Sequence, residues 1–160
     1  MSFSTSATVT RFASPFMVYW KGKIKHKKSD ALVSQLDLFS SLARLTGSDL
    51  RADDSLDLLD TFMGNSDLGR KELILEATTR TAFRIGDWVM IPPYIGPAKL
   101  KAVNIEIGNS NNYQLYDLSQ DISQQVNLAE SKPEKLNEMI LKFKEIRGED
   151  YKKIKKLELK

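Results

Sequence analysis

The only histidine of the sequence, His26, is the first residue that could do chemistry. It lies in K-G-K-I-K-H-K-K and could act as a general base or as a metal ligand. The lysines around it disfavour a bound cation, and the sequence has no cysteine or second histidine to complete a zinc site. We therefore interpret His26 as a solvated loop residue and predict no metal site in this chain.

The lysine run around His26, from Lys21 to Lys28, directly follows Tyr19 and Trp20. Basic residues beside aromatic ones could bind nucleic acid or a sulfated polysaccharide. The run is short and the net charge is only +3, so we favour a solvated turn whose aromatic side chains are buried in the preceding strand. We predict no nucleic-acid binding, and a polyanion-binding or sulfated-glycan-binding module remains an alternative.

Two further patterns imitate functional motifs without completing them. The acidic stretch lacks the ligand spacing, central glycine and closing glutamate of an EF-hand, and it predicts a surface loop. Its carboxylates are those of Asp49, Asp53, Asp54, Asp57 and Asp60. S-K-P-E-K, residues 131–135, imitates a Ser-x-Pro-x-Arg nucleophile motif but ends in lysine, and Ser131 is placed to cap a helix with Pro133 in its first turn. With no glycine-rich phosphate loop and no G-x-S-x-G, we predict no catalytic residue.

The composition indicates a soluble chain of one-domain length. It has 160 residues, 41% of them hydrophobic, and a mean hydropathy of −0.35, which is enough apolar material for a core. The absence of cysteine excludes disulfides. No apolar run reaches membrane-spanning length and the first ten residues do not resemble a signal peptide, so we predict no membrane contact and assign no compartment.

In the first third, P-F-M-V-Y-W (15–20) predicts a buried strand. The following 29–47 predicts a helix that ends at Gly47, with a buried stripe that contains Leu32, Leu36, Phe39 and Ala43. Alternatively, Asp37 caps a shorter helix and 31–34 is extended. We expect this strand and helix to need an apolar partner that the rest of the chain does not supply.

After an acidic, turn-rich segment (48–69), the pattern changes to strands. E-L-I-L-E-A (72–77) predicts one strand, R-T-A-F-R-I-G-D-W-V-M-I (80–91) predicts a hairpin turning at Gly86 and Asp87, and V-N-I-E-I and Y-Q-L-Y-D-L predict two more. A final helix runs to Gly148. Its predicted apolar face consists of Leu136, Met139, Ile140, Phe143 and Ile146. The fold class is α+β, a small antiparallel sheet with a packed C-terminal helix.

Five pieces of the sequence between residues 11 and 148 carry a resemblance through their order. They are the 15–25 strand with its W-x-G-K-I turn, the 29–47 helix, D-S-L-D-L-L-D-T-F-M-G, the 80–91 hairpin, and Q-L-Y-D-L-S-Q-D-I-S-Q-Q-V-N-L-A. In this order they resemble the C-terminal section of the arylsulfatase-type sulfatases in the alkaline phosphatase superfamily. The departures are Lys21, which replaces the family's proline, and Gln124 and Gln125, which lie near its usual glutamate. The resemblance implies a strand-helix-loop remnant of the large α/β domain (13–69) and the C-terminal subdomain (70–148), between a loose segment (1–12) and a charged tail (149–160).

The resemblance also implies what the chain contributes. Sulfatases hydrolyse sulfate esters with a formylglycine beside a calcium ion, and those residues lie in the family's N-terminal section. No catalytic or metal residue is carried over, so we expect no cofactor and no hydrolysis in this chain alone. We predict a fragment that supports the enzyme and lines its cleft, with Arg80, Arg84 and Tyr94 near a sulfated glycan or aryl sulfate. Its expected partner is the missing catalytic domain, a separate catalytic chain or a second copy. Many family members are exported or periplasmic.

Overall fold

The computed structural model describes residues 16–77, 80–96, 99–100, 105–106 and 109–148. The chain divides into two compact units, one comprising Ala13–Leu73 and the other Ile74–Lys160 with Met1–Phe12. We call them the N-terminal unit and the C-terminal unit and describe each by itself. The predicted loose segment 1–12 and charged tail 149–160 lie outside the described residues.

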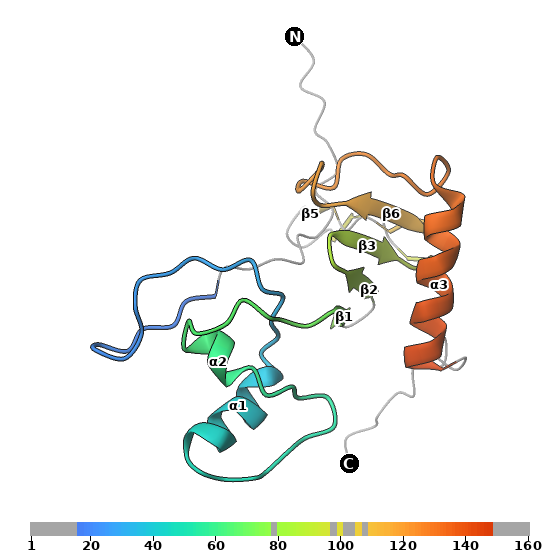
Figure 1. Cartoon of the computed structure of the whole chain (residues 1–160). Coiled ribbons are helices and arrows are strands. Elements are labelled where there is room, and N and C mark those ends of the chain that lie inside the picture. The colour runs from blue at the N-terminus through green and yellow to red at the C-terminus, as the bar shows by residue number, and fades with distance from the viewer. Residues whose placement is uncertain (1–15, 78–79, 97–98, 101–104, 107–108, 149–160) are drawn as a thin grey trace. The chain divides into compact units, whose positions relative to one another are not determined.

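Two helices form the regular part of the N-terminal unit, α1 (Asp37–Leu45) and the single turn α2 (Leu59–Phe62), which pack against each other (Figure 1). The observed helix is therefore the shorter of the two predicted ones, but its predicted Asp37 cap is wrong, because Leu36 occupies the N-cap position and no side chain caps the helix. It ends as predicted at Gly47, which has a φ of 77°. The Ser48 amide donates to Ala43 O and the Gly47 amide to Arg44 O, the paired bonds of a Schellman motif that favours glycine in a left-handed conformation.

The predicted strand over 15–20 does not form. Residues 16–20 have no regular secondary structure. The segment then turns tightly, because the amides of Lys23 and Ile24 both donate to the carbonyl of Trp20. A β-strand requires a neighbour to accept and donate its backbone hydrogen bonds, and no strand of the described N-terminal unit lies beside this segment.

The C-terminal unit is built on a four-stranded sheet in the order β1-β2-β3-β6. Its strands are β1 (Glu72–Ala77), β2 (Arg80–Ile85), β3 (Trp88–Ile91) and β6 (Gln114–Asp117). β2 and β3 pair antiparallel with Ile85 opposite Trp88, so the predicted two-residue hairpin loop is confirmed. Gly86 has a φ of 54°, which glycine adopts readily at the first loop position. β3 and β6 also pair antiparallel, with Val89 opposite Tyr116.

Helix α3 (Pro133–Arg147) covers one face of this sheet (Figure 1). The predicted Pro133 first turn and the Gly148 end are confirmed. The Ser131 cap is not, because Lys132 occupies the N-cap position and the Ser131 hydroxyl donates to Leu128 O instead. A separate two-stranded pair joins β4 (Lys99–Leu100) to β5 (Ile105–Glu106), the latter within the predicted V-N-I-E-I strand.

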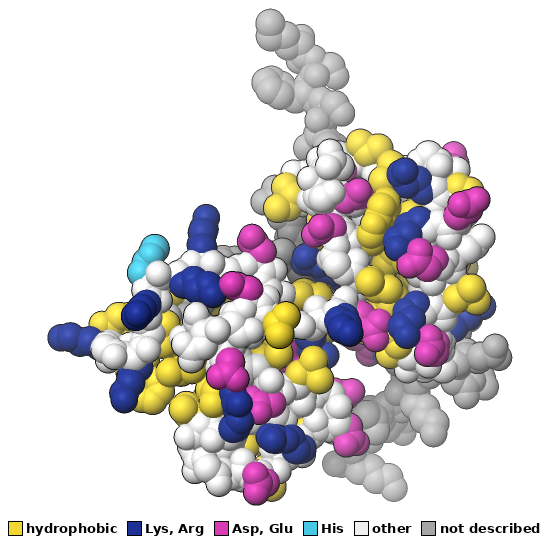
Figure 2. Space-filling model, viewed as in Figure 1, with side chains coloured by type: hydrophobic (Ala, Val, Ile, Leu, Met, Phe, Trp, Pro, Cys, Tyr) yellow, Lys and Arg dark blue, Asp and Glu magenta, His cyan; other side chains and the backbone are white. Residues whose placement is uncertain are grey.

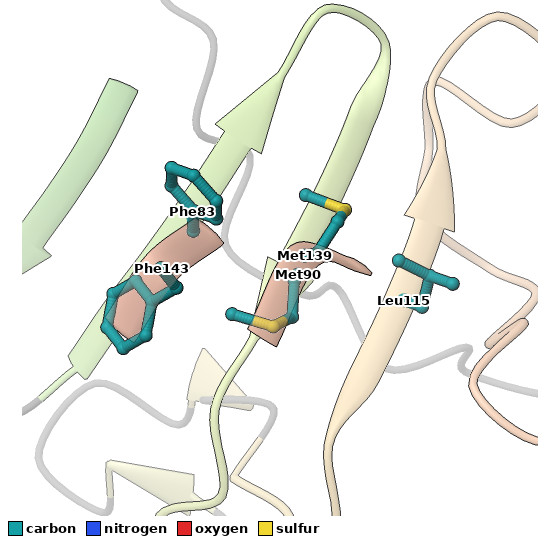
Figure 3. Packing of buried hydrophobic residues seen from close by; sticks show 5 residues of the cluster. All are labelled: Phe83, Met90, Leu115, Met139 and Phe143. Carbon is teal, nitrogen blue, oxygen red and sulfur yellow. The ribbon is translucent and has the colours of Figure 1, made fainter. Parts of the chain in front are cut away.

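The core of the C-terminal unit lies between the sheet and α3. Figure 3 shows side chains of the sheet meeting side chains of the helix. The buried cluster consists of Phe83, Met90, Leu115, Met139 and Phe143. The rings of Phe83 and Phe143 pack with centroids 5.7 Å apart, within the range that favours tilted aromatic pairs. Alternation along the strands and the 3.6-residue period of the helix direct this cluster into the space between them. A second buried cluster, on the other face of the sheet, consists of Ala82, Val89, Ile91 and Tyr116.

Candidate functional site

The inner side of α1 is polar. Asp37, Ser40 and Ser41 are each 0% exposed. The Ser40 amide donates to Ser55 Oγ at 3.0 Å, while Ser40 Oγ donates to the Ser55 carbonyl at 3.1 Å. The Ser41 hydroxyl accepts a hydrogen bond of 2.8 Å from the Leu58 amide and donates to the Asp37 carbonyl. These bonds attach the loop that leads into α2 to the helix.

Asp37 is the centre of this polar interior. Its carboxylate accepts the amides of Ser34 at 2.8 Å and Leu56 at 2.9 Å. Arg70 Nε lies 2.8 Å from Oδ2 of the same carboxylate, and its guanidinium also donates to the carbonyl of Asp54. A buried carboxylate is tolerated when it is paired and fully hydrogen-bonded. Asp37 therefore links the start of α1 to two segments that lie 19 and 33 residues further along the chain.

The outer side of α1 is apolar. Leu36 is 53% exposed, Phe39 and Leu42 are each 51% exposed, and Leu45 is exposed as well. The 3.6-residue period places Phe39 and Leu42 on the side opposite Asp37, Ser40 and Ser41, with Leu36 and Leu45 at the two edges of that side. The predicted burial of Leu36 and Phe39 is therefore wrong, whereas Leu32 and Ala43 are half-buried. The physical reason is that the buried carboxylate and hydroxyls occupy the interior of this unit.

A second apolar surface lies on residues 16–20. Met17 is 89% exposed and Tyr19 is 81% exposed, and Trp20 is also exposed. The prediction that Tyr19 and Trp20 are buried in a strand is therefore wrong. Phe16 is half exposed, and its ring packs against that of Phe62 in α2 at a centroid distance of 5.6 Å. We refer to residues 16–20 and the outer side of α1 as the two apolar surfaces of the N-terminal unit.

The lysine loop after Trp20 is exposed, as predicted, and so is His26. In Figure 2 the histidine lies among lysine and arginine side chains with hydrophobic atoms nearby. Lys27 Nζ binds Asp67 Oδ2 at 2.9 Å. This hydrogen bond is the main reason why the pKa of Asp67 is lowered, and a hydrogen bond from Ser29 contributes less. An open depression of ≈ 400 Å³ lies beside this pair. It is lined by Lys28, Ser29, Asp30, Ala31 and Asp67.

The three predicted cleft residues lie on or just after two neighbouring strands. Arg84 is in β2, and its Nε donates to the carbonyl of Gly86 at 2.7 Å, beside the hairpin turn. Tyr94 follows β3, is half-buried, and its amide donates to Ser110 O. Arg80 begins β2, and its side chain lies outside the described residues. Their assignment to a substrate cleft stays a prediction.

The segment after β6 is held by side-chain hydrogen bonds. Asn127 Oδ1 accepts the amides of Leu115 and Ala129, each at 3.0 Å, and the Leu128 amide donates to Leu115 O. Asp121 Oδ2 accepts the Val126 amide at 2.8 Å. Gln124 is 4% exposed and adopts a φ of 55°. The L-Y-D-L-S-Q-D-I-S-Q-Q-V-N-L-A pattern thus encodes a strand and a loop that folds back on it.

Neither a metal site nor a membrane span is found in the part of the chain that the structure describes. Within the described residues, no three histidine, cysteine, aspartate or glutamate side chains are placed to hold a metal ion. None of their helices is long and apolar enough to cross a bilayer.

Comparison with known proteins gives one curated relative at high similarity. The chain is 38% identical over 129 residues to an N-acetylgalactosamine-6-O-sulfatase of Bacteroides thetaiotaomicron. The aligned region covers 78% of this chain and 25% of the relative. A solved structure from work on the metabolism of multiple glycosaminoglycans by the same organism matches with a TM-score of 0.73 and 35% identity, over 79% of this chain and 27% of that one. No protein-family model matches. The chain is a sulfatase relative.

The fold agrees with this relationship. A solved 2-O glycosaminoglycan sulfatase matches 74% of this chain and 26% of its own at a TM-score of 0.51 and 19% identity, which shows the shared fold. The chain corresponds to the C-terminal section of a sulfatase, and it spans about a quarter of the length of the curated relative. The sequence pieces quoted for this resemblance include α1, α2, the β2-β3 hairpin and the segment from β6 to Ala129.

The sequence patterns missed the residues that organise the N-terminal unit. Arg70, Ser40 and Ser41 were not recognised, although Asp37, Ser40, Ser41 and Arg44 recur at helical spacing. That recurrence predicts a polar side of α1 as clearly as the leucines predict an apolar one. What it cannot show is which of the two sides faces the interior.

Proposed function

We propose that this chain is the non-catalytic C-terminal part of a sulfatase that acts on a sulfated glycan. In this proposal, the sections of the enzyme that this chain does not match supply the nucleophile and the calcium ligands. The observation that supports it most strongly is the 38% identity to an N-acetylgalactosamine-6-O-sulfatase over a quarter of that enzyme. The relative's name favours a 6-O-sulfated amino sugar as the substrate of the intact enzyme.

The proposed contribution of these residues is to support the catalytic body and to line its cleft. Arg84 supports the second role because a guanidinium carries five N–H donors. Its Nε is bound to Gly86, and its other nitrogens could bind a sulfate oxygen. Tyr94 offers an aromatic face and a hydroxyl to a sugar ring.

A hybrid enzyme tests the proposed function. In it, this chain replaces the matching section of the N-acetylgalactosamine-6-O-sulfatase, and sulfate release from 6-O-sulfated N-acetylgalactosamine is measured. We expect the hybrid to turn over, and the 160-residue chain alone to hydrolyse neither this sugar nor an aryl sulfate. A folded hybrid without activity, or a lone chain with activity, would contradict the proposal.

Two arginine variants of the hybrid test the cleft assignment. Arg84→Ala is expected to raise KM, because a sulfate contact is lost, whereas Arg51→Ala replaces an exposed arginine of the N-terminal unit and should leave KM unchanged. Equal kinetics for the two variants would remove Arg84 from the cleft.

A second candidate function is binding of a sulfated glycan by the lysine loop itself. It is favoured by the exposure of Tyr19 and Trp20 beside Lys21 and Lys23, since exposed aromatics can stack on sugar rings while lysines pair with sulfates. Binding of the chain to heparin that weakens steeply with salt would support it. If the double variant Lys21→Ala/Lys23→Ala binds heparin as tightly as the unchanged chain, this loop is excluded as the binding site.

A further inference from the structure

We propose that the loop after β3, residues 92–96, binds a second sugar of an extended glycan, with Tyr94 as the stacking side chain and Gly96 as the residue that sets its position. We call these five residues the β3 platform. The inference rests on the proposed function and narrows its substrate class to an oligosaccharide or a polymer, rather than a single sulfated sugar.

The ring of Tyr94 occupies the space in which a side chain at position 96 would begin. A Cβ added to Gly96 would overlap Cε1 of this ring, and it would lie 3.2 Å from Cδ1 and 3.1 Å from Asn109 Nδ2. Gly96 does not have a positive φ, so the conformation of its backbone does not require glycine. The close approach of the Tyr94 ring is therefore what requires glycine here.

The backbone of Tyr94 is fixed as well. Its amide donates to the carbonyl of Ser110 at 2.9 Å, which ties the β3 platform to the segment that leads into β6. Pro92 and Pro93 precede it, and each proline ring fixes its own φ. A side chain that is held in place before its ligand arrives loses less conformational entropy on binding. These contacts therefore suit a preorganised binding surface.

The chemistry of the β3 platform fits the ring of a sugar. Tyr94 is half-buried, so part of its side chain remains in solvent, and the neighbouring Ile95 is 87% exposed. An aromatic ring can cover the apolar C–H face of a pyranose while its hydroxyl bonds to a polar group of the sugar. The sequence P-P-Y-I-G carries no charge. The platform therefore fits a sugar ring rather than a sulfate group.

The β3 platform lies too far from Arg84 for both to contact one sugar. Arg84 Nε binds the carbonyl of Gly86 at the hairpin turn, which precedes β3, whereas Tyr94 follows the other end of β3. The four residues of β3 lie between them, and at about 3.4 Å per residue they span roughly 13 Å. A glycan that reaches both Arg84 and Tyr94 must therefore contain more than one sugar.

Kinetics of the hybrid enzyme on a short and a long substrate test this inference. The substrates are 6-O-sulfated N-acetylgalactosamine and a tetrasaccharide that carries the same sulfated sugar. We expect Tyr94→Ala to raise KM for the tetrasaccharide about tenfold more than KM for the monosaccharide, because an aromatic contact is lost only with the longer substrate. Arg84→Ala should raise both KM values alike. Equal effects of Tyr94→Ala on the two substrates would overturn the inference and leave the proposed function standing.

Two glycine variants test whether Gly96 acts through the ring. Gly96→Ala should raise KM for the tetrasaccharide several-fold, and it should have no further effect when Tyr94 is already alanine. Gly69→Ala is the matched control, because its added Cβ would meet the backbone of Leu32 instead of a side chain. It should lower the melting temperature without changing the ratio of the two KM values. Additive effects of Gly96→Ala and Tyr94→Ala would show that Gly96 does not position the ring.

Nuclear magnetic resonance of the isolated chain gives a readout that needs no turnover. Gly96→Ala should shift the ring signals of Tyr94 and leave those of Tyr19 in place, and unchanged Tyr94 signals would overturn the positioning role. A folded hybrid that hydrolyses neither substrate would overturn the proposed function. In that case, shifts of the Tyr94 signals on addition of the tetrasaccharide, reduced in Gly96→Ala, would still support the β3 platform, and their absence would overturn it.

Discussion

The two units of this chain place their polar and apolar residues in opposite ways. In the C-terminal unit, Phe83, Met90 and Phe143 are buried between a sheet and a helix. In the N-terminal unit, the side chains buried along α1 are Asp37, Ser40 and Ser41, and the leucines lie outside. Hydrophobic burial is the dominant favourable term of folding. The first arrangement therefore suits a unit that is stable by itself, and we propose that the second is completed by a partner.

Among the changes that test this difference between the units, removal of the buried carboxylate is expected to lower stability the most. Asp37→Ala leaves the Arg70 guanidinium and the amides of Ser34 and Leu56 without their shared acceptor. We expect local stability to fall by about 3–5 kcal/mol, measured by hydrogen exchange of the α1 amides. Asp49→Ala, at an exposed position, is the control. Protection of α1 that survives Asp37→Ala would show that the polar interior is not what holds this unit.

The matching change in the other unit removes buried apolar volume. Met139 is 0% exposed between α3 and the sheet, and Met139→Ala is expected to cost about 2–5 kcal/mol because it leaves a cavity. Hydrogen exchange of the β2 and β3 amides measures this loss. Lys144→Ala, at an exposed position of the same helix, should change these rates little. A neutral Met139→Ala would contradict an apolar core at this interface.

The exposed phenylalanine of α1 sharpens the contrast with Met139. Phe39→Ser in the isolated chain is expected to lower the free energy of unfolding by only about 1 kcal/mol, because about half of this side chain is already exposed. Denaturant titration gives this value. A loss comparable to that of Met139→Ala would mean that Phe39 is already covered within the chain.

The smallest expected effect is a pH dependence confined to the C-terminal unit. Burial, followed by the charge of Asp121, raises the pKa of Tyr116 above its ordinary value of 10.0. The folded state therefore holds this proton more tightly than the unfolded state, and the associated stability is complete below about pH 10 and lost as the pH rises through the folded pKa. Tyr116→Phe should reduce the alkaline loss of stability, whereas Tyr19→Phe should not. An unchanged pH profile in Tyr116→Phe would show that this hydroxyl does not cause the dependence.

The elements that the sequence predicts correctly are the ones that depend on neighbours in the chain. Gly86 and Asp87 between apolar runs define the β2-β3 hairpin, and Pro133 and Gly148 bound α3. The apolar face of α3 is also mostly right, with Met139 and Phe143 buried and Ile146 exposed. Turn residues and helical periodicity are local sequence signals, so they predict these elements without knowledge of the tertiary structure.

The failures are at positions whose surroundings come from far along the chain. The polar side of α1 is buried where the sequence predicts an apolar one. This is because Ser55 and Arg70, which lie 15 and 33 residues from the α1 residues that they bind, pack on that side. An amphipathic pattern predicts that a helix has one polar and one apolar side, but it does not predict which of the two is buried when both are continuous. Residues 15–20 carry the composition of a strand, but a strand also needs an adjacent edge, and none lies beside the described part of this segment.

The most direct test of the account is a crystal structure of the hybrid sulfatase that contains this chain. We predict that Phe39 and Leu42, each 51% exposed in the chain alone, are buried against the catalytic body, and that residues 16–20 are hydrogen-bonded as a strand of its sheet. A hybrid structure in which both apolar surfaces remain in solvent would contradict the claim that the N-terminal unit is built to be covered.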